Sequence, residues 1–486
     1  MKNFHVAIIG GGVIGSAIAW ELSKYKLDVV VFEKGSDVAS GTSKANSGVV
    51  HSGINSAPAS LKARFCVAGN KMLQPLSNQL GFPLEWVGKY VVAKNEEEVK
   101  ELEQLKTVGE NNQVPNLKIK DGKDIKEPNV SCYKALWVPT AGIMLPYKFT
   151  IALAENAAEN NVNFLIETEV KDLKKVDNHF LIKTNKGECQ SQILVNSAGL
   201  NCRNIVSMLE EPDFRLYPCR GEYLVLDKNY SNLINSMIYP VPPKELGVLG
   251  VHITPTIEGN ILLGPSAEFI DDHEDKRTTK EMMQTLFNEA KEIIPRLPEK
   301  AVISAYSGIR CKLASPDEGG WADYRIEESR QTAGLINLLG IESPGLTAAP
   351  AIAKEVSKMI SKSIKLNPKT NFKTRKTMNK RFSQMNPKEQ SDLIKKDERW
   401  GRIVCRCEHV AEAEVIEALS NPIGAQTLSA VKYRCRAGMG RCQGGFCTQH
   451  TVRIMEEQFN IDVNKIKLKS SNSKLFSGRT REIKND

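Results

Sequence analysis

The chain opens with alternating apolar and turn-forming stretches that predict one complete strand–helix–strand unit. Residues 5–35 read HVAIIGGGVIGSAIAWELSKYKLDVVVFEKG: an apolar run, a glycine-rich turn, a helical stretch, and a second apolar run that ends at Glu33. Short continuous apolar runs fit strands that are buried on both faces, as in a parallel sheet. We therefore expect an α/β fold that begins with a βαβ unit.

Two later stretches resemble this pattern but lie far along the chain. QILVNSAGLN predicts a buried strand that runs from Ile193 into Ala198 and Gly199, and GLINLLGIESPGLTAAPAIAKEV predicts a strand, a turn through Pro344 and Gly345, and a helix. A nicotinamide-binding domain is usually one contiguous stretch. These pieces are instead dispersed along the chain.

The glycine-rich turn carries the first chemical signal. In its Gly-x-Gly-x-x-Gly sequence, Gly10 allows a tight turn, Gly12 lets backbone N–H groups approach a pyrophosphate, and Gly15 allows helix and strand to pack closely. Glu33 is placed to accept hydrogen bonds from a ribose. Such turns also occur in doubly wound sheets without a nucleotide, and the acidic residue favours dinucleotide binding.

Composition and charge narrow the class of protein. The chain has 486 residues, of which 41% are hydrophobic and 25% charged, and is too long for a single core. Its net charge of +9 is concentrated between residues 362 and 388, which indicates a local surface and not a nucleic-acid partner. The apolar run after Lys2 lacks a cleavage site, and no apolar stretch reaches the roughly 18 residues that a membrane span needs. These features predict a cytoplasmic protein, with peripheral attachment to the cytoplasmic face of a membrane left open.

Four of the eleven cysteines are grouped near the C-terminus. Cys405 and Cys407 form C-x-C, and after a gap of 34 residues Cys442 and Cys447 form C-x-x-x-x-C among glycines. In a reducing compartment, clustered thiols indicate a metal or redox centre in preference to disulfides. Their spacing alone leaves both a tetrahedral zinc ion and a [2Fe-2S] cluster open.

The N-terminal module resembles flavoenzymes of the D-amino-acid oxidase and FAD-dependent glycerol-3-phosphate dehydrogenase superfamily. SGTSKANSGVVHSGIN is similar to the segment that these enzymes pass beneath the flavin, and AYSGIRCKLAS is similar to their Ser-Gly-x-Arg motif. The resemblance implies a Rossmann-like FAD-binding domain with an inserted antiparallel-sheet substrate domain. It implies FAD contacts at Gly10, Gly12, Gly15, Glu33, Lys34, Ser40, Gly41, Thr42, Ser43, Val170, Ala198, Gly199, Gly340, Pro344, Gly345, Leu346 and Thr347.

The same resemblance assigns roles in substrate oxidation. Oxidation of an alcohol or amine by flavin needs a base and an anchor, and the resemblance implies His51 as the base and Arg310 as the anchor of an anionic group. PCRGEYLVLD around Arg220 and GVHITPTIEGNILLGPSAE around His252 are also similar to family segments, the latter to L-2-hydroxyglutarate oxidising enzymes. We expect Arg220 and His252 either to contact substrate or to brace the sheet. Lys312 is a further candidate substrate contact.

Two departures from the family pattern bear on the substrate. Glycerol-3-phosphate dehydrogenases normally carry an arginine after the His-x-Gly segment and Gly-Gly-Lys near the returning helix, where this chain has Asn55 and GIESPGL. Each missing charge-assisted hydrogen bond weakens phosphate binding by about 1.5 to 3 kcal/mol unless another group replaces it. A carboxylate substrate therefore competes with a phosphate.

The C-terminal stretches VCRCEHVAEAEVIEAL and RCRAGMGRCQGGFC resemble the small iron–sulfur domain of bacterioferritin-associated ferredoxin. This domain also closes the flavoprotein subunit of anaerobic glycerol-3-phosphate dehydrogenases. The resemblance implies a small, mainly helical domain in which Cys405, Cys407, Cys442 and Cys447 bind a [2Fe-2S] cluster and Cys435 is a packed thiol. We expect helices over residues 412–419 and 427–435.

The expected organisation is an FAD-dependent oxidoreductase module over residues 1–360, a basic linker over 361–400, the cluster domain over 401–455 and a polar tail over 456–486. Within the module we expect FAD-binding pieces at about 1–70, 145–205 and 330–360 and substrate-domain pieces at about 71–144 and 206–329. The linker's Lys- and Asn-rich composition predicts a solvated tether. The alternative is a basic surface for an acidic electron-transfer protein or an anionic lipid.

These patterns and resemblances together predict an FAD-dependent dehydrogenase that oxidises sn-glycerol 3-phosphate to dihydroxyacetone phosphate. Electrons would pass through the cluster to a protein or quinone acceptor. Oxidation of a 2-hydroxy acid or amino acid, such as L-2-hydroxyglutarate or hydroxyproline, is the first alternative. An electron-transfer subunit without its own substrate is the second. The sequence leaves open whether the chain forms a homo- or hetero-oligomer and whether FAD is attached covalently through His51.

Overall fold

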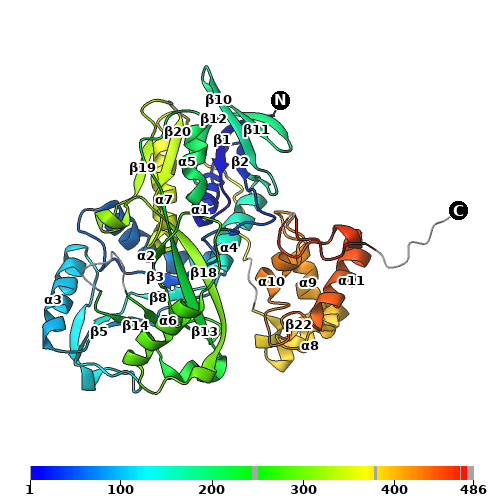
Figure 1. Cartoon of the computed structure of the whole chain (residues 1–486). Coiled ribbons are helices and arrows are strands. Elements are labelled where there is room, and N and C mark those ends of the chain that lie inside the picture. The colour runs from blue at the N-terminus through cyan, green and yellow to red at the C-terminus, as the bar shows by residue number, and fades with distance from the viewer. Residues whose placement is uncertain (1, 243–249, 377–379, 471, 479–486) are drawn as a thin grey trace.

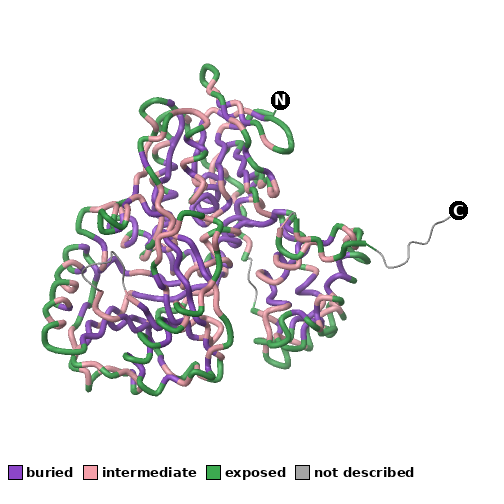
Figure 2. The backbone as a smooth tube through the Cα atoms, viewed as in Figure 1, coloured by how far each residue is buried: buried purple, intermediate pink, exposed green. Residues whose placement is uncertain are grey.

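The structure is a computed structural model that describes residues 2–242, 250–376, 380–470 and 472–478. The chain forms two sheet domains and a small helical domain, drawn in orange and red, which lies beside them (Figure 1). Buried backbone is concentrated in the central strands, whereas the outer helices α3 (Glu96–Asn111) and α8 (Pro387–Lys396) carry few buried residues (Figure 2). No helix among the described residues has the length and apolar character that crossing a membrane requires.

The first sheet collects its eight strands from three distant parts of the chain. β20, β12, β1, β2 and β9 run parallel in that order, the β10–β11 hairpin extends the other half of β12, and β19 pairs antiparallel with β20. The predicted return of the chain to its first sheet is therefore confirmed. The strands are β1 (Lys2–Ile9), β2 (Val29–Phe32), β9 (Asn163–Leu165), β10 (Val170–Val176), β11 (His179–Thr184), β12 (Gly187–Asn196), β19 (Arg325–Glu328) and β20 (Leu335–Leu339).

Both faces of this sheet are covered, as the continuous apolar runs predict. Along β1, Val6 and Ile8 pack with helices α1 (Val13–Leu22), α2 (Leu61–Leu80), α4 (Pro146–Glu159) and α7 (Gly345–Ile360). Ala7 and Ile9 face the opposite core, which contains the β10–β11 hairpin and α5 (Cys202–Ser207). Two expected domain boundaries need correction, because residue 70 lies inside α2, which packs in this core, and residue 330 separates two paired strands.

The second sheet has nine strands and is antiparallel except where β14 pairs parallel with β5. Alternate residues of β5 face opposite cores, so that Tyr90 packs on the side of α6 (Lys280–Ile293) and Val91 on the side of α3. A small sheet of β3 (Val49–Val50), β8 (Gly142–Met144) and β4 (Leu84–Glu85) completes the module. The large sheet contains β5 (Lys89–Ala93), β6 (Lys118–Asp121), β7 (Lys134–Val138), β13 (Tyr217–Leu226), β14 (Met237–Pro240), β15 (His252–Pro255), β16 (Ile261–Gly264), β17 (Glu268–Phe269) and β18 (Val302–Lys312).

The C-terminal domain has a core of its own. It consists of α8, the hairpin β21 (Ile403–Cys405) and β22 (Val410–Ala411), and the helices α9 (Glu412–Leu419), α10 (Leu428–Cys435) and α11 (Cys447–Phe459). The helix expected over residues 412–419 is confirmed. The second expected helix begins at Leu428, because the side chain of Thr427 caps it by accepting from the N–H of Ala430.

The stretch predicted as a solvated tether lies along the first domain instead. The side chains of Asn156 and Asn160 on α4 donate to the carbonyls of Arg375 and Lys373 at 2.8 Å each, and the N–H of Lys369 donates to the carbonyl of Lys24 at 2.8 Å. These bonds replace the water that would solvate a tether. The composition of the segment gave no sign of them, because the partners are elsewhere in the chain. Residues 377–379 of this segment and 471 and 479–486 of the expected tail lie outside the described residues.

Buried ion pairs hold the C-terminal domain against both sheet domains. Arg434 pairs with Asp37 at 2.6 Å and with Glu155 at 2.7 Å, both in the first domain. Arg436 pairs with Glu258 of the second domain at 3.2 Å and with Glu408 of its own domain at 2.6 Å. Arg381 also pairs with Glu258, at 3.2 Å, and with Glu408, at 3.5 Å. We call Arg381, Arg436, Glu258 and Glu408 the interface quartet.

Candidate functional site

A cavity of 1180 Å³ is lined by residues of both sheet domains. It extends from the ends of β1 and β2 along residues 40–57 to β18 and the turn at residues 341–346. Among the residues predicted to contact FAD or substrate, Gly15, Gly340, Thr347 and Arg220 do not line it, and the others do. The predicted flavin and substrate residues are therefore brought together around one space.

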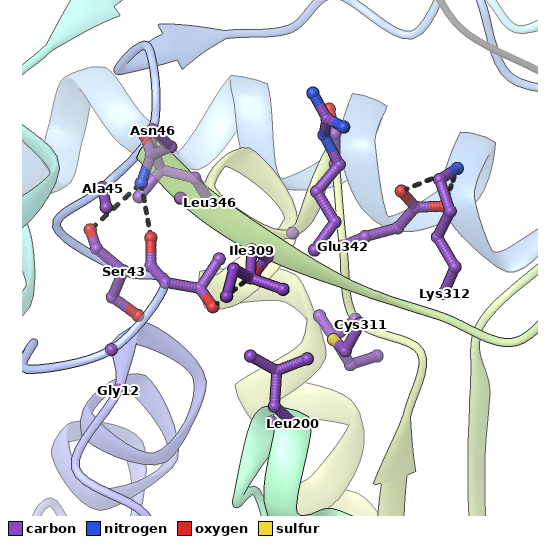
Figure 3. Close-up of a pocket in the computed structure, with 18 of the residues that line it drawn as sticks. Gly12, Ser43, Ala45, Asn46, Leu200, Ile309, Cys311, Lys312, Glu342 and Leu346 are labelled. Atoms are coloured by element: carbon purple, nitrogen blue, oxygen red, sulfur yellow. Dashed lines mark hydrogen bonds and ion pairs between the residues drawn. The ribbon is translucent and has the colours of Figure 1, made fainter. Parts of the chain in front are cut away.

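The glycine turn after β1 forms one end of the cavity. Gly10 has a φ of +106°, and a Cβ on it would lie 2.6 Å from the carbonyl oxygen of Ser197; a Cβ on Gly15 would lie 2.0 Å from that of Gly10. The first N–H of α1, at Val13, donates to Oγ of Ser43 at 2.9 Å, so this hydroxyl lies at the helix N-terminus (Figure 3). A helix N-terminus with a hydroxyl beside it and space in front fits a pyrophosphate.

Glu33 is fixed at the end of β2. Its two carboxylate oxygens accept from the N–H groups of Gly11 at 2.8 Å and Gly35 at 2.7 Å. Burial raises the pKa of Glu33, and these two hydrogen bonds oppose the rise. The carboxylate therefore has a set orientation at the cavity wall, as ribose recognition requires. Its neighbour Lys34 pairs with Glu274 at 3.7 Å, across to the second domain.

The segment that follows is tied to strand β18. Oγ1 of Thr42 donates to the carbonyl of Ile309 at 2.8 Å, and the amide of Asn46 donates to the carbonyls of Thr42 and Ser43 at 3.1 Å each (Figure 3). Gly308 permits this approach, because a Cβ there would lie 1.9 Å from the carbonyl oxygen of Ala45. A glycine inside a strand signals close backbone approach, and this signal was available in the sequence.

His51 lies in the cavity wall with both its backbone and its ring held. Its N–H donates to Oγ1 of Thr347 at 2.9 Å, and Nε2 lies 3.0 Å from Oγ of Ser343. Burial and the charge of Lys89 lower the pKa of His51 to about 3. The imidazole is therefore neutral near pH 7 and able to accept a proton. Sequence reasoning missed Ser343, which carries no motif of its own.

Arg310 lies partly buried at the end of β18. Its guanidinium donates to the carbonyl of Ser266 at 2.8 Å and to Sγ of Cys219 at 3.2 Å. Within the described part of the chain no carboxylate forms an ion pair with it. A guanidinium that faces a cavity without a carboxylate partner is suited to bind an anion.

Lys312, also predicted as a substrate contact, is paired with a carboxylate that it shares with a second lysine. Glu342 pairs with Lys312 at 3.2 Å and with Lys62 at 2.8 Å (Figure 3). Lys312 also donates to the carbonyl of Gly320 at 2.8 Å. Although Lys312 touches the cavity, its contacts make it a brace between β18 and the turn at residue 342.

Arg220 and His252, for which the sequence left two roles open, lie in different places. Arg220 is buried outside the cavity, where it pairs with Glu268 at 2.6 Å, Asp275 at 2.7 Å and Glu222 at 3.7 Å, so its expected contact with substrate gives way to bracing. His252 lines the cavity and stacks on Tyr239 with ring centroids 3.8 Å apart. Burial, with Lys89 second, lowers the pKa of His252 well below its usual value.

The four C-terminal cysteines meet as two pairs. Sγ of Cys407 lies 3.7 Å from Sγ of Cys442, and the thiols of Cys405 and Cys447 hydrogen-bond to each other. The hydrogen bond from Cys447, followed by backbone N–H groups beginning with Gly438, lowers the pKa of Cys405 to about 5. Cys407 and Cys442 are exposed, whereas Cys405 and Cys447 are buried.

This arrangement suits two irons better than one ion. Two thiol pairs match the two-per-iron ligation of a [2Fe-2S] cluster. Close packing at Gly440, where a Cβ would lie 2.2 Å from Cβ of Cys407, shows why glycine stands there. Cys435 instead donates to the carbonyl of Val431 at 3.3 Å within α10.

Comparisons with known proteins agree with both parts. Residues 5–359 match the family described as FAD dependent oxidoreductase, and residues 403–457 match the BFD-like [2Fe-2S] binding domain. The chain is 40% identical over 484 residues to a glycerol 3-phosphate dehydrogenase of Caloramator mitchellensis, covering 98% of this chain and 99% of the relative. It is 32% identical to a mitochondrial L-2-hydroxyglutarate dehydrogenase of Arabidopsis thaliana, covering 73% of this chain and 83% of that one.

A solved structure extends the comparison to three dimensions. Dithionite-reduced L-α-glycerophosphate oxidase of Mycoplasma pneumoniae, with FAD bound, is 32% identical with a TM-score of 0.72, covering 76% of this chain and 98% of the oxidase. The chain belongs to the FAD dependent oxidoreductase family and ends in a BFD-like [2Fe-2S] binding domain.

Proposed function

We propose that the chain is a dehydrogenase that oxidises sn-glycerol 3-phosphate to dihydroxyacetone phosphate. The observation that carries this proposal is one cavity that contains a neutral His51 and an Arg310 to which no described carboxylate is paired. The full-length relative named glycerol 3-phosphate dehydrogenase supports the same substrate. The residues of the glycine turn and Glu33 would hold FAD, which when bound accepts a hydride from the substrate carbon.

The side chains around the reacting carbon have separate tasks. His51 takes the hydroxyl proton, and Ser343 orients the imidazole through its Oγ, which lies 3.0 Å from Nε2. Arg310 holds the anionic group, so that the carbinol carbon stays in one position. The hydrogen bond from the backbone N–H of His51 to Oγ1 of Thr347 fixes the position of the His51 backbone.

A 2-hydroxy acid is the second candidate substrate, and specific contacts favour it. Asn55 stands where the related enzymes carry an arginine, and Lys312 is paired with Glu342. Of the residues predicted as substrate cations, Arg310 alone has no described carboxylate paired with it. A single guanidinium binds a carboxylate as readily as a phosphate.

We also propose that electrons leave through the C-terminal cluster to a protein or quinone acceptor. Cys407 and Cys442 are exposed, which gives an acceptor access to one edge of the cluster. Arg406 and Arg441 are exposed beside them, and the nearby Glu408 is engaged by Arg436. An electron-transfer subunit without a substrate would not require the cavity with His51 and Arg310.

Anaerobic reduction of the flavin tests the proposal. Protein purified without oxygen is mixed with sn-glycerol 3-phosphate or with L-2-hydroxyglutarate, and the flavin absorbance is followed. Bleaching by sn-glycerol 3-phosphate supports the first candidate, and bleaching by the hydroxy acid alone supports the second. If neither bleaches the flavin while chemical reductants do, the electron-transfer subunit is the better description.

A further inference from the structure

Lys89 is a buried lysine that the mechanism above does not use. It begins strand β5, and only 1% of its surface is exposed. Its Nζ donates to Oδ1 of Asn55 at 3.3 Å and lies 4.4 Å from the ring centroid of Tyr239. None of the described carboxylates forms an ion pair with this ammonium. Burying a charge without a counter-ion is costly, so such a group indicates a functional site.

The contact with Lys89 fixes how Asn55 presents itself to the cavity. Asn55 lines the cavity, and Lys89 lies behind it. Because an ammonium has three donors and no acceptor, the oxygen of the Asn55 amide must face Lys89. The NH₂ group of the amide, with its two donors, is then directed away from Lys89. An anion in the cavity would meet these donors with a positive charge immediately behind them.

The titratable groups around Lys89 do not balance its charge. They are His51, His252, Cys66 and the hydroxyl of Tyr239. Burial raises the pKa of Cys66 to about 12, and lowers the pKa values of both imidazoles below their usual range. Burial also raises the pKa of Tyr239. All four are neutral near pH 7, and in a wall of low polarity the ammonium attracts an anion more strongly than it would in water.

We propose that Asn55 and Lys89 form a second anion subsite, in which Asn55 donates to the substrate and Lys89 positions the amide and supplies the positive charge. This inference rests on the proposed function and deepens it, because it specifies the substrate class as a small dianion. One part of the charge binds Arg310 and the other binds the Asn55–Lys89 subsite. A phosphate monoester and a dicarboxylic hydroxy acid share this chemistry, whereas a monocarboxylic acid does not. Related enzymes carry an arginine at the position of Asn55. In this chain, Asn55 and Lys89 together would take the place of that arginine.

The test measures anion binding separately from turnover. The holoenzyme and its Lys89→Met and Asn55→Ala variants are titrated with inorganic phosphate and with acetate, and binding is followed by flavin difference spectra and thermal unfolding. Lys148→Met is the matched control, because Lys148 is another buried lysine, on α4. We expect the phosphate dissociation constant to rise about tenfold in either subsite variant and to stay within twofold in the control. Acetate binding should change less than twofold throughout.

A double variant and steady-state kinetics distinguish a role in anion binding from a purely structural role. The Lys89→Met/Asn55→Ala double variant should lose little more phosphate affinity than the weaker-binding single variant, because the two side chains act through one contact. With the dianionic substrate that bleaches the flavin, KM should rise about tenfold in Lys89→Met, with kcat changed less than threefold. Unchanged phosphate affinity in folded Lys89→Met, or an equal loss in Lys148→Met, would overturn the proposal.

Two further variants decide the matter if Lys89→Met does not fold. Lys89→Arg keeps the charge and should keep phosphate affinity within about threefold. Asn55→Asp places a carboxylate against Lys89 and should abolish the preference for phosphate over acetate; a retained preference would overturn the subsite. The substrate arms are independent of these titrations. Failure of sn-glycerol 3-phosphate to bleach the flavin, with L-2-hydroxyglutarate active, rejects the proposed substrate and leaves the dianion class intact. Equal bleaching by L-lactate rejects that class.

Discussion

Nε2 of His51 lies 3.0 Å from Oγ of Ser343, a residue 292 positions further along the chain. His51 precedes α2, and Ser343 belongs to the turn that leads into α7. The packing of α2 against α7 in one core therefore sets the orientation of the imidazole. A base held in this way by a second side chain needs no rearrangement before it accepts a proton.

Replacing the base should separate chemistry from binding. We expect His51→Gln to slow flavin reduction about 10²- to 10⁴-fold, because the proton then has no positioned acceptor. Ser343→Ala should slow it less, about tenfold, since the imidazole remains but loses its orienting partner. Anaerobic stopped-flow reduction at saturating substrate measures both rates. Equal rates for His51→Gln and the parent protein would remove His51 from the chemistry.

The pH dependence of the same reaction reports two buried groups. The pKa of His51 is lowered to about 3, so the imidazole stays neutral as the pH falls, and the limiting rate should show no loss near pH 6.5. Burial lowers the pKa of Lys89 to about 8, so its charge is lost as the pH rises through that value. We therefore expect the dissociation constant of the anionic substrate to rise above pH 8. A limiting rate that halves near pH 6.5 would contradict the neutral imidazole.

Arg310 should govern affinity for the anionic group. Arg310→Lys keeps the charge but removes the planar pair of donors, and we expect KM to rise about tenfold or more with a smaller change in kcat. Arg325→Lys is the control, because Arg325 pairs at the protein surface with Asp213 and Glu327. Steady-state kinetics with an artificial acceptor provide both constants. An unchanged KM would exclude Arg310 from the anion site.

Removal of one cluster thiol should separate reduction of the flavin by substrate from delivery of electrons to an acceptor. In Cys407→Ser we expect loss of iron and of the broad visible absorbance, because the cluster requires all four thiolates. Substrate should still bleach the flavin, whereas electron delivery to a one-electron acceptor should stop. Cys435→Ala should keep its full iron content, since that thiol bonds within α10. Bound zinc without iron in the parent protein would reject the cluster.

The buried arginine of the domain interface should carry much of the stability of the C-terminal domain. Arg434→Met leaves Asp37 and Glu155 buried without their partner, which typically costs about 3 to 5 kcal/mol. Chemical denaturation and limited proteolysis between residues 360 and 403 would detect the loss. Arg453→Met, which removes an exposed pair with Glu457, should leave the midpoint nearly unchanged.

Local patterns predicted the parts of this molecule that depend on neighbouring residues. The glycine turn, the end of β2 at Glu33 and the four cysteines could be found because each lies in a short stretch whose neighbouring residues form a recognisable motif. Ser343, the partners of Arg220 and the hydrogen bonds from Asn160 to the supposed tether could not, because each joins distant segments. Lys89 reads from sequence as an ordinary strand residue. Its contact with Asn55 is apparent only in the folded structure, where β5 passes behind Asn55.

The interface quartet has a consequence for the electrons. Its four side chains are largely shielded from solvent, so salt weakens their attraction less than it weakens surface pairs. The distance between the flavin site and the cluster site would then stay the same during turnover, and electrons would tunnel over that fixed distance. Electron transfer from the flavin to the cluster would not require a movement of the C-terminal domain, and solvent viscosity would have little influence on its rate.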